Sequence, residues 1–159
     1  TTTLPLWTLD INVTGGYSTG NLPVQKYHSF ESASGGFAAA GAFRGLKEKE
    51  YYGDRFATLS LEHNFGELIP GLIRIPDIAS FGVEVIAYGG AGWSDFRDAN
   101  AVKSIYPYIQ ATSQTADRIY YEAGVGFNRL LLFFRFDISA RLSQVSGPAY
   151  SLTFSTATN

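Results

Sequence analysis

The sequence contains no cysteine and no methionine among its 159 residues. The lack of cysteine excludes disulfides, thiolate metal sites and a thiol nucleophile. Charged residues make up only 16% of the chain, against about a quarter in a soluble domain. The 12 basic and 14 acidic side chains give a net charge of −2, whereas proteins that bind nucleic acid through its phosphates usually carry an excess of basic residues. We therefore expect no nucleic-acid partner.

Long hydrophobic runs are also missing. The longest uncharged apolar run, residues 130–134, is far shorter than the roughly 20 residues that a membrane helix needs. The sequence therefore predicts no membrane-spanning helix. The chain does not open with a charged segment followed by an apolar one, so we expect any export signal to lie upstream of Thr1.

Glycine and aromatic residues are abundant, which favours strands and turns. Apolar and polar residues alternate with a period of two in many segments, as where Phe134, Phe136 and Ile138 interleave with Arg135 and Asp137. This pattern predicts about seven strands, at residues 7–14, 37–43, 57–65, 81–88, 120–128, 134–142 and 150–155.

Turn signals separate these segments. Gly89-Gly90 predicts a turn, and Asn128-Arg129 predicts the tight turn of a hairpin between two long strands. Residues 66–79 and 92–117 carry prolines and mixed charge, and they are predicted to be loops or strand extensions.

A soluble β-sandwich and a membrane β-barrel both show such alternation. Three features favour the barrel, with its apolar face toward lipid. The strands exceed the usual 5 or 6 residues, aromatic residues end the apolar rows as interfacial girdles do, and the polar face carries charges at mid-strand. These charged residues are Glu62, Glu84, Glu122, Arg135, Asp137 and Arg141. We expect them to form a structural ionic network in the lumen; the alternative is a substrate or ion path.

About seven strands are too few for a single-chain transmembrane barrel, for which eight is the known minimum. We therefore expect residues 1–159 to be part of one antiparallel transmembrane β-barrel that this chain alone does not close. The remaining N-terminal strands, and any periplasmic domain, are expected upstream or from other subunits.

Three segments carry a family resemblance: Phe43-Arg44-Gly45-Leu46, the Tyr-Tyr-Gly-Asp-Arg run at 51–55, and the strand that ends in Glu-His-Asn-Phe-Gly at 62–66. They resemble the C-terminal barrel of the bacterial outer-membrane insertase (surface antigen) superfamily. The closer likeness is to outer-membrane barrels that carry an N-terminal carboxypeptidase-regulatory-like domain. Matching segments extend the resemblance from about residue 23 to residue 154.

The resemblance implies a bacterial outer-membrane protein that assembles or exports other surface proteins, or that anchors an envelope complex. Membrane lipid, other barrel strands and the outer-membrane assembly machinery would be its partners. Arg44 would lock an inward-folded loop by pairing with Glu62 or Glu84; the alternative is a solvated loop arginine. The spacing of a C-terminal assembly signal is matched by Gly147, Tyr150, Leu152 and Phe154.

Nothing in the sequence predicts an enzyme, a cofactor or a metal site. His28 has no second histidine at ligand spacing. A hydrolase at the barrel rim, the remaining alternative, would need a Ser-His pair such as His63 with Ser60 or Ser80.

Overall fold

The part of the chain that the structure describes is all-β with one short helix. The computed structural model describes residues 7–20, 23, 26–39, 41–48, 50–73, 82–97, 119–143 and 150–157. In chain order the elements are β1 (Thr8–Tyr17), β2 (His28–Ser29), β3 (Tyr52–Gly53), β4 (Arg55–Asn64), α1 (Leu68–Ile73), β5 (Glu84–Asp95), β6 (Ile119–Leu130), β7 (Phe134–Arg141) and β8 (Tyr150–Thr156).

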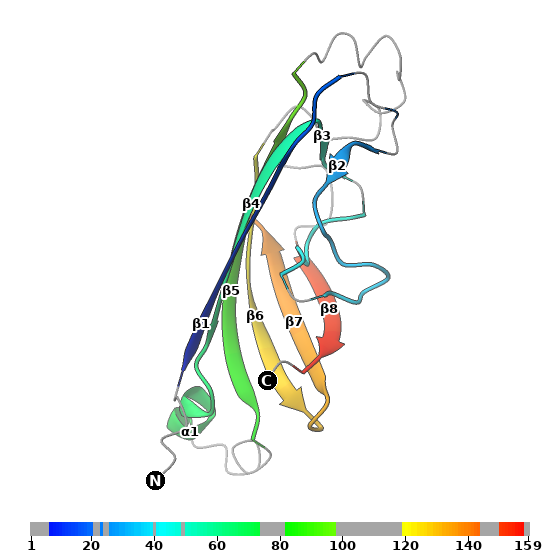
Figure 1. The fold of residues 1–159 in the computed structure, drawn as a ribbon. Helices are drawn as coiled ribbons and strands as arrows, with labels where there is room; N and C mark the ends of the chain where they lie inside the picture. Colours follow the sequence, from blue (N-terminus) through cyan, green and yellow to red (C-terminus); the bar gives the residue numbers. More distant parts are fainter. Residues whose placement is uncertain are drawn as a thin grey trace.

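Six long strands form one curved antiparallel sheet in the order β1-β4-β5-β6-β7-β8 (Figure 1). β2 and β3 form a separate two-residue pairing. The predicted all-β antiparallel class is thus confirmed, but the sheet has six strands rather than about seven. The described residues of the strand predicted at 37–43, which are 37–39 and 41–43, do not form a strand; isolated bridges such as Ser32–Phe43 hold them instead. Their glycine and alanine content explains this, since neither residue favours a strand.

Two predicted turns and one predicted loop are corrected by the structure. Gly89-Gly90 lies in the middle of β5, and β6 continues through Asn128 and Arg129 to Leu130. The hairpin turn between β6 and β7 therefore lies at residues 131–133. The segment predicted as a loop at 66–79 contains α1.

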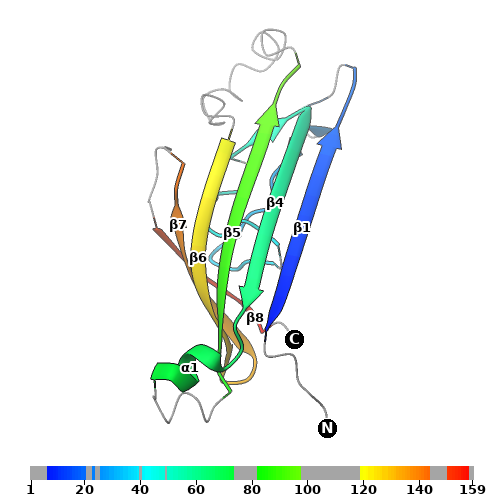
Figure 2. The same ribbon diagram turned by 90° about the vertical axis from the view of Figure 1, so that its left-hand side faces the viewer.

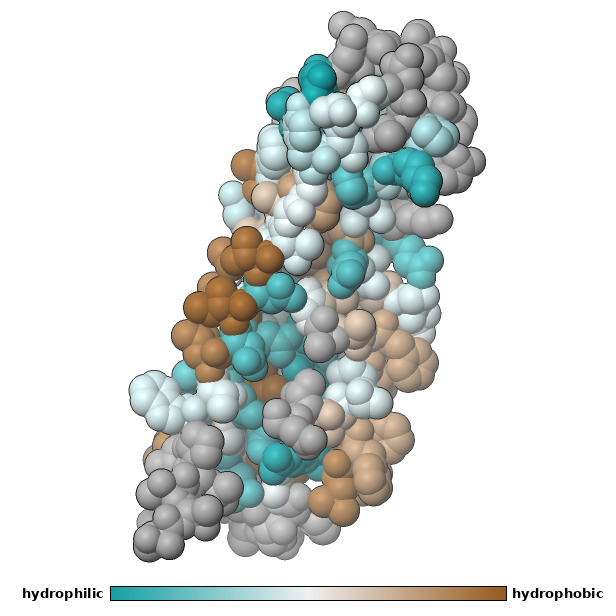
Figure 3. Space-filling model, viewed as in Figure 1, coloured by the Kyte–Doolittle hydropathy of each residue, from teal (hydrophilic) through white to brown (hydrophobic). Residues whose placement is uncertain are grey.

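The sheet has two chemically different faces, because side chains alternate along each strand and the register places apolar residues opposite apolar ones and polar residues opposite polar ones. On the face that we call the outer face, Ile11 lies opposite Leu61, and Ile138 lies opposite Leu152. The other face, the inner face, carries the polar and ionic side chains. Figure 3 shows hydrophobic side chains along the margins of the molecule and hydrophilic ones between them on the concave side.

The chain between β1 and β4 folds back over the inner face. Figures 1 and 2 place this inner loop, residues 30–39, 41–48 and 50–51, on the concave side of the sheet. Its aromatic residues make a small core against the sheet: the ring centroids of Phe43 and Tyr120 are 5.1 Å apart, and those of Phe30 and Tyr51 are 5.2 Å apart. The core thus lies between the inner loop and the inner face.

The two glycines of β5 on the inner face make room for this core. A Cβ atom at Gly90 would lie 2.7 Å from the Phe43 ring, and one at Gly92 would lie 2.6 Å from the Phe30 ring. Both distances are too short for real atoms, so these positions admit no larger residue without moving the inner loop. Of the Gly89-Gly90 pair that suggests a turn in the sequence, Gly90 is in fact a docking position for an aromatic ring.

Candidate functional site

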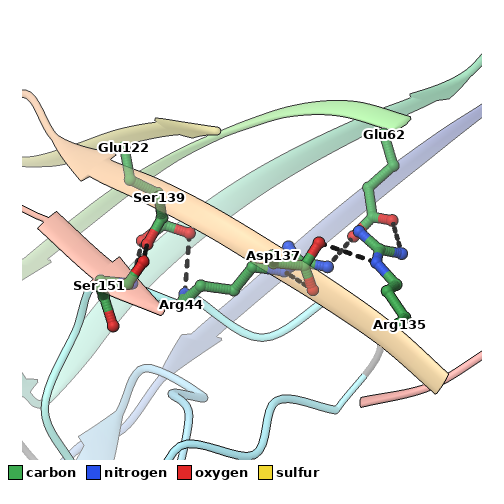
Figure 4. A network of polar contacts seen from close by, with 8 residues as sticks. Arg44, Glu62, Glu122, Arg135, Asp137, Ser139 and Ser151 are labelled. Atoms are coloured by element: carbon green, nitrogen blue, oxygen red, sulfur yellow. Dashed lines mark hydrogen bonds and ion pairs between the residues drawn. The ribbon is translucent and has the colours of Figure 1, made fainter. Parts of the chain in front are cut away.

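Four charged side chains on the inner face form a closed ring of alternating sign (Figure 4). Arg44, from the inner loop, contacts Glu62 of β4 at 2.6 Å and Asp137 of β7 at 3.1 Å. Arg135 of β7 contacts the same two carboxylates, Glu62 at 2.7 Å and Asp137 at 2.9 Å. Each arginine therefore meets both acids, and the ring has no net charge. We call these four residues the charge ring.

Three of the four residues of the charge ring are buried, and the Glu62 side chain is 17% exposed. Asp137 is 0% exposed, Arg135 is 1% exposed and Arg44 is 5% exposed. The Arg44 guanidinium also lies 4.0 Å from the centre of the Tyr88 ring, a cation–π contact. Burial by itself lowers the pKa of Arg44, but the carboxylates of Glu62 and Asp137 outweigh it and raise the pKa above its ordinary value. Arg44 therefore remains charged.

A second set of contacts fixes the backbone of the inner loop beside the charge ring. The Glu122 carboxylate accepts hydrogen bonds from the backbone N–H of Arg44 at 2.9 Å and of Gly45 at 2.7 Å. The Arg141 guanidinium donates to the Gly45 carbonyl and pairs with Glu50 through two nitrogens. One peptide segment is thus held at both its donor and its acceptor groups by two facing side chains of β6 and β7.

Gly45 fits this position because a side chain would not. An added Cβ would lie 2.9 Å from the Tyr120 hydroxyl and 3.2 Å from a Glu122 oxygen. The Arg-Gly pair therefore has a local physical basis: the arginine reaches the charge ring, and the glycine lets the backbone approach Glu122 and Arg141.

Glu84, the other candidate partner of Arg44, belongs to a different cluster. Its carboxylate accepts hydrogen bonds from the side-chain amides of Asn64 at 2.8 Å and Asn128 at 2.9 Å, and it pairs with Arg129 at 2.9 Å. Of the two alternatives, Glu62 is the residue that contacts Arg44. The six charged residues predicted for one face thus fall into three clusters: Glu62, Arg135 and Asp137 in the charge ring, Glu122 with Arg141 against the inner loop, and Glu84 apart.

The C-terminal candidates lie in β8. Tyr150, Leu152 and Phe154 point from the outer face and are exposed, whereas Gly147 lies outside the described residues. Part of the free edge of β8 meets the inner loop, because the Phe154 N–H donates to the Gly36 carbonyl at 2.7 Å and the Phe154 carbonyl accepts from the Ala38 N–H at 3.0 Å.

The Ser-His pairs were also located. Ser60 and His63 lie on opposite faces of β4, since Ser60 faces Asn12 while His63 packs against Trp7 and Phe65. Ser80 lies outside the described residues.

A pair that the sequence did not suggest joins the end of β1 to β2, where the Ser18 hydroxyl oxygen lies 2.8 Å from His28 Nε2. No described carboxylate or amide is seen to bind the other ring nitrogen of His28, as the third member of a triad would.

Comparison of the chain with protein-family models, curated proteins and solved structures found no match. What the site does is therefore inferred from its geometry. Among the described residues, His, Asp and Glu side chains form no group of three that would hold a metal ion. No helix in those same stretches is long and apolar enough to cross a membrane.

Sequence reasoning missed several members of the site. Glu50, the partner of Arg141, lies in a run of lysines and glutamates that reads as a solvated loop. Tyr88, which lies under Arg44, occupies a position with no distinguishing pattern. Tyr120 lies two residues before Glu122 and therefore on the same face of the strand, but spacing does not predict its hydrogen bond to Glu122 at 2.7 Å. Their roles depend on where the inner loop folds.

Proposed function

We propose that this chain forms part of the wall of a bacterial outer-membrane β-barrel of the insertase (surface antigen) type. Its inner face would line the lumen, and the inner loop would be fixed inside that lumen by the charge ring and by Glu122 and Arg141. The role of the segment itself is structural rather than catalytic. The complete protein would assemble or export other outer-membrane proteins, or anchor an envelope complex.

One observation carries this proposal: the burial of the two faces is inverted relative to a soluble protein. Most charged residues of the inner face are buried, with exceptions that include Glu62, whose side chain is 17% exposed, and Asp10 of β1, while a broad set of large apolar side chains on the outer face is exposed. These exposed residues are Leu9, Ile11, Val13, Leu59, Leu61, Tyr121, Val125, Ile138, Leu152 and Phe154. A contiguous apolar surface of this kind favours contact with lipid.

The direction of the strands supports the same proposal. At one end of the sheet the connections β1–β4 and β5–β6 span residues 18–54 and 96–118, and β7–β8 spans 142–149. At the other end the β6–β7 turn spans only residues 131–133, whereas the β4–β5 connection, which contains α1, spans 65–83. Outer-membrane barrels have long extracellular loops and short periplasmic turns. On this basis the end of the sheet that carries the β6–β7 turn and α1 would face the periplasm.

The test is membrane fractionation of the complete protein combined with heat-modifiable migration on a gel. We expect the protein to remain in the outer-membrane fraction after carbonate washing, to need detergent for extraction, and to migrate faster before boiling than after it. A known soluble periplasmic protein serves as the control. Recovery of the folded protein in the soluble fraction would overturn the proposal and favour the alternative, a soluble all-β binding module.

A further inference from the structure

The turn between β6 and β7 is unusually apolar for a surface turn. Leu131, Leu132 and Phe133 are 80%, 69% and 70% exposed, respectively. The Phe133 N–H donates to the Leu130 carbonyl at 3.3 Å, which closes a β-turn with Leu131 and Leu132 at its centre, inside the three-residue connection 131–133. Three large hydrophobic side chains therefore project together from the end of a hairpin.

The backbone conformation of this turn is also unusual for leucine. Leu131 and Leu132 have φ angles of 49° and 71°, in the left-handed region. A β-turn with positive φ angles at both central residues is normally built from asparagine and glycine, because a side chain such as leucine is strained there. Neither the backbone nor exposure to water favours two leucines at this position, which points to an apolar environment for the turn.

The charges next to the turn point away from its apolar tip. Arg129 pairs with Glu84 on the inner face, and Arg135 is buried in the charge ring. The run from Leu130 to Phe134 thus presents no charge, and at Phe134 it continues into the apolar outer face of β7. At the same end of the sheet, Leu72 of α1 and Trp7 are also exposed.

We propose that the β6–β7 turn inserts into lipid at the membrane interface, so that Leu131, Leu132 and Phe133 lie among acyl chains rather than in the periplasm. The occupant is lipid rather than a protein groove because the tip is continuous with the outer face, which is itself proposed to face lipid. This inference therefore rests on the proposed function. It adds that the barrel wall is anchored at this end by a turn as well as by its strands.

The test uses the absence of cysteine from the chain, which allows a single introduced thiol to carry a nitroxide label. The complete protein, free of other thiols, is reconstituted into vesicles of phosphatidylethanolamine and phosphatidylcholine. Labels are placed by L132C in the turn, I138C on the outer face and T19C at the opposite end of the sheet. Collision of each label with oxygen, which enters lipid, is compared with collision with a water-soluble nickel complex.

We expect the labels at L132C and I138C to collide mainly with oxygen, and the label at T19C to collide mainly with nickel. If I138C reports lipid while L132C reports water, the inference about the turn is wrong and the proposed function stands. If both report water in a folded protein, both proposals fall. Where L132C does not fold, as judged by heat-modifiable migration, F133C replaces it in the same turn.

A second variant tests whether the leucines themselves hold the turn in lipid. L131N and L132G together suit the left-handed backbone and remove the apolar tip. With the label at F133C, the ratio of oxygen to nickel collisions is expected to fall several-fold relative to F133C alone. An unchanged ratio would show that the leucines do not hold the turn in lipid, and would overturn the inference.

Discussion

Asp137 is the residue on which the charge ring depends most directly, because it is fully buried and faces two guanidinium groups. A buried ion pair adds little net stability over apolar residues, but the loss of one partner leaves an uncompensated charge. In this ring each acid is shared, so removing one acid leaves two arginines competing for the other.

We predict that D137N lowers the free energy of unfolding by about 3–5 kcal/mol. Asparagine keeps the shape of the side chain, but it removes the negative charge and turns an amide toward the arginines. The measurement is urea unfolding of the protein in lipid vesicles, followed by the heat-modifiable band.

The matched control for D137N is S139A, which changes the next inward-facing residue of β7. The Ser139 hydroxyl makes one long hydrogen bond, of 3.5 Å, to the Ser151 carbonyl, so its loss should lower the free energy of unfolding by about 1 kcal/mol at most. Equal effects of the two substitutions would contradict the special role of the ring.

Shared partners also change how a charge swap should behave. Exchanging Arg44 and Glu62 restores their own pair, but the new arginine at 62 would face Arg135 and the new glutamate at 44 would face Asp137. Sequence reasoning, which pairs Arg44 with one carboxylate, leads one to expect that such a swap rescues stability. Because each residue of the charge ring has two partners, exchanging Arg44 and Glu62 is not expected to restore stability, even if the two residues pair with each other.

At the scale of elements, the strands were predictable and the inner loop was not. Period-two alternation depends on neighbouring residues, so it located the six long strands and put the charged residues on one face. The turn predicted at Gly89-Gly90 is wrong, because these residues lie inside β5. A glycine that accommodates a ring from a distant segment, as Gly90 does, has the same local sequence pattern as a glycine in a turn.

The partners of the inner loop come from far along the chain. Arg44 meets Asp137, and Gly45 meets Arg141, contacts that no short-range pattern specifies. Arg44 is singled out in the sequence by its place in a motif, whereas Glu50 and Tyr88 carry no comparable signal. Local spacing thus predicts the strands of the sheet, whereas tertiary packing determines which residues cover its concave side.

The neighbouring glycines of β5 offer a test of how the inner loop docks. G90V places a branched side chain where the Phe43 ring lies, whereas G89V adds the same side chain to the outer face, with only the Glu122 carbonyl at 3.7 Å. We predict that G90V lowers the free energy of unfolding by about 1–3 kcal/mol through overpacking.

G90V should also speed tryptic cleavage after Lys47, an exposed residue of the inner loop, because the valine displaces the Phe43 ring that packs the loop against β5. G89V should leave the rate of cleavage unchanged and should not destabilise the protein, since valine favours strands. Slow cleavage in both variants would mean that the Phe43 contact does not hold the loop.

At the scale of the whole molecule, the described residues form an open sheet. β1 pairs with β4 alone, and both faces of β1 are exposed almost along its whole length. β8 pairs with β7 and has only a short contact with Gly36 and Ala38 at its other edge. Six strands are fewer than the eight of the smallest transmembrane barrels, and unpaired backbone groups are costly in hydrocarbon.

The edge of β1 is therefore the place where closure of the proposed barrel is best tested. We predict that, in the complete protein in lipid vesicles, every backbone amide of β1 exchanges slowly with deuterium, because a further strand pairs with its free edge. In an open sheet only the alternate amides that bond to β4 would be protected. β4, which is paired on both sides, supplies the internal reference for full protection. Alternation of fast and slow amides along β1, beside uniform protection in β4, would show that this edge stays open and that β1 is the margin of the wall.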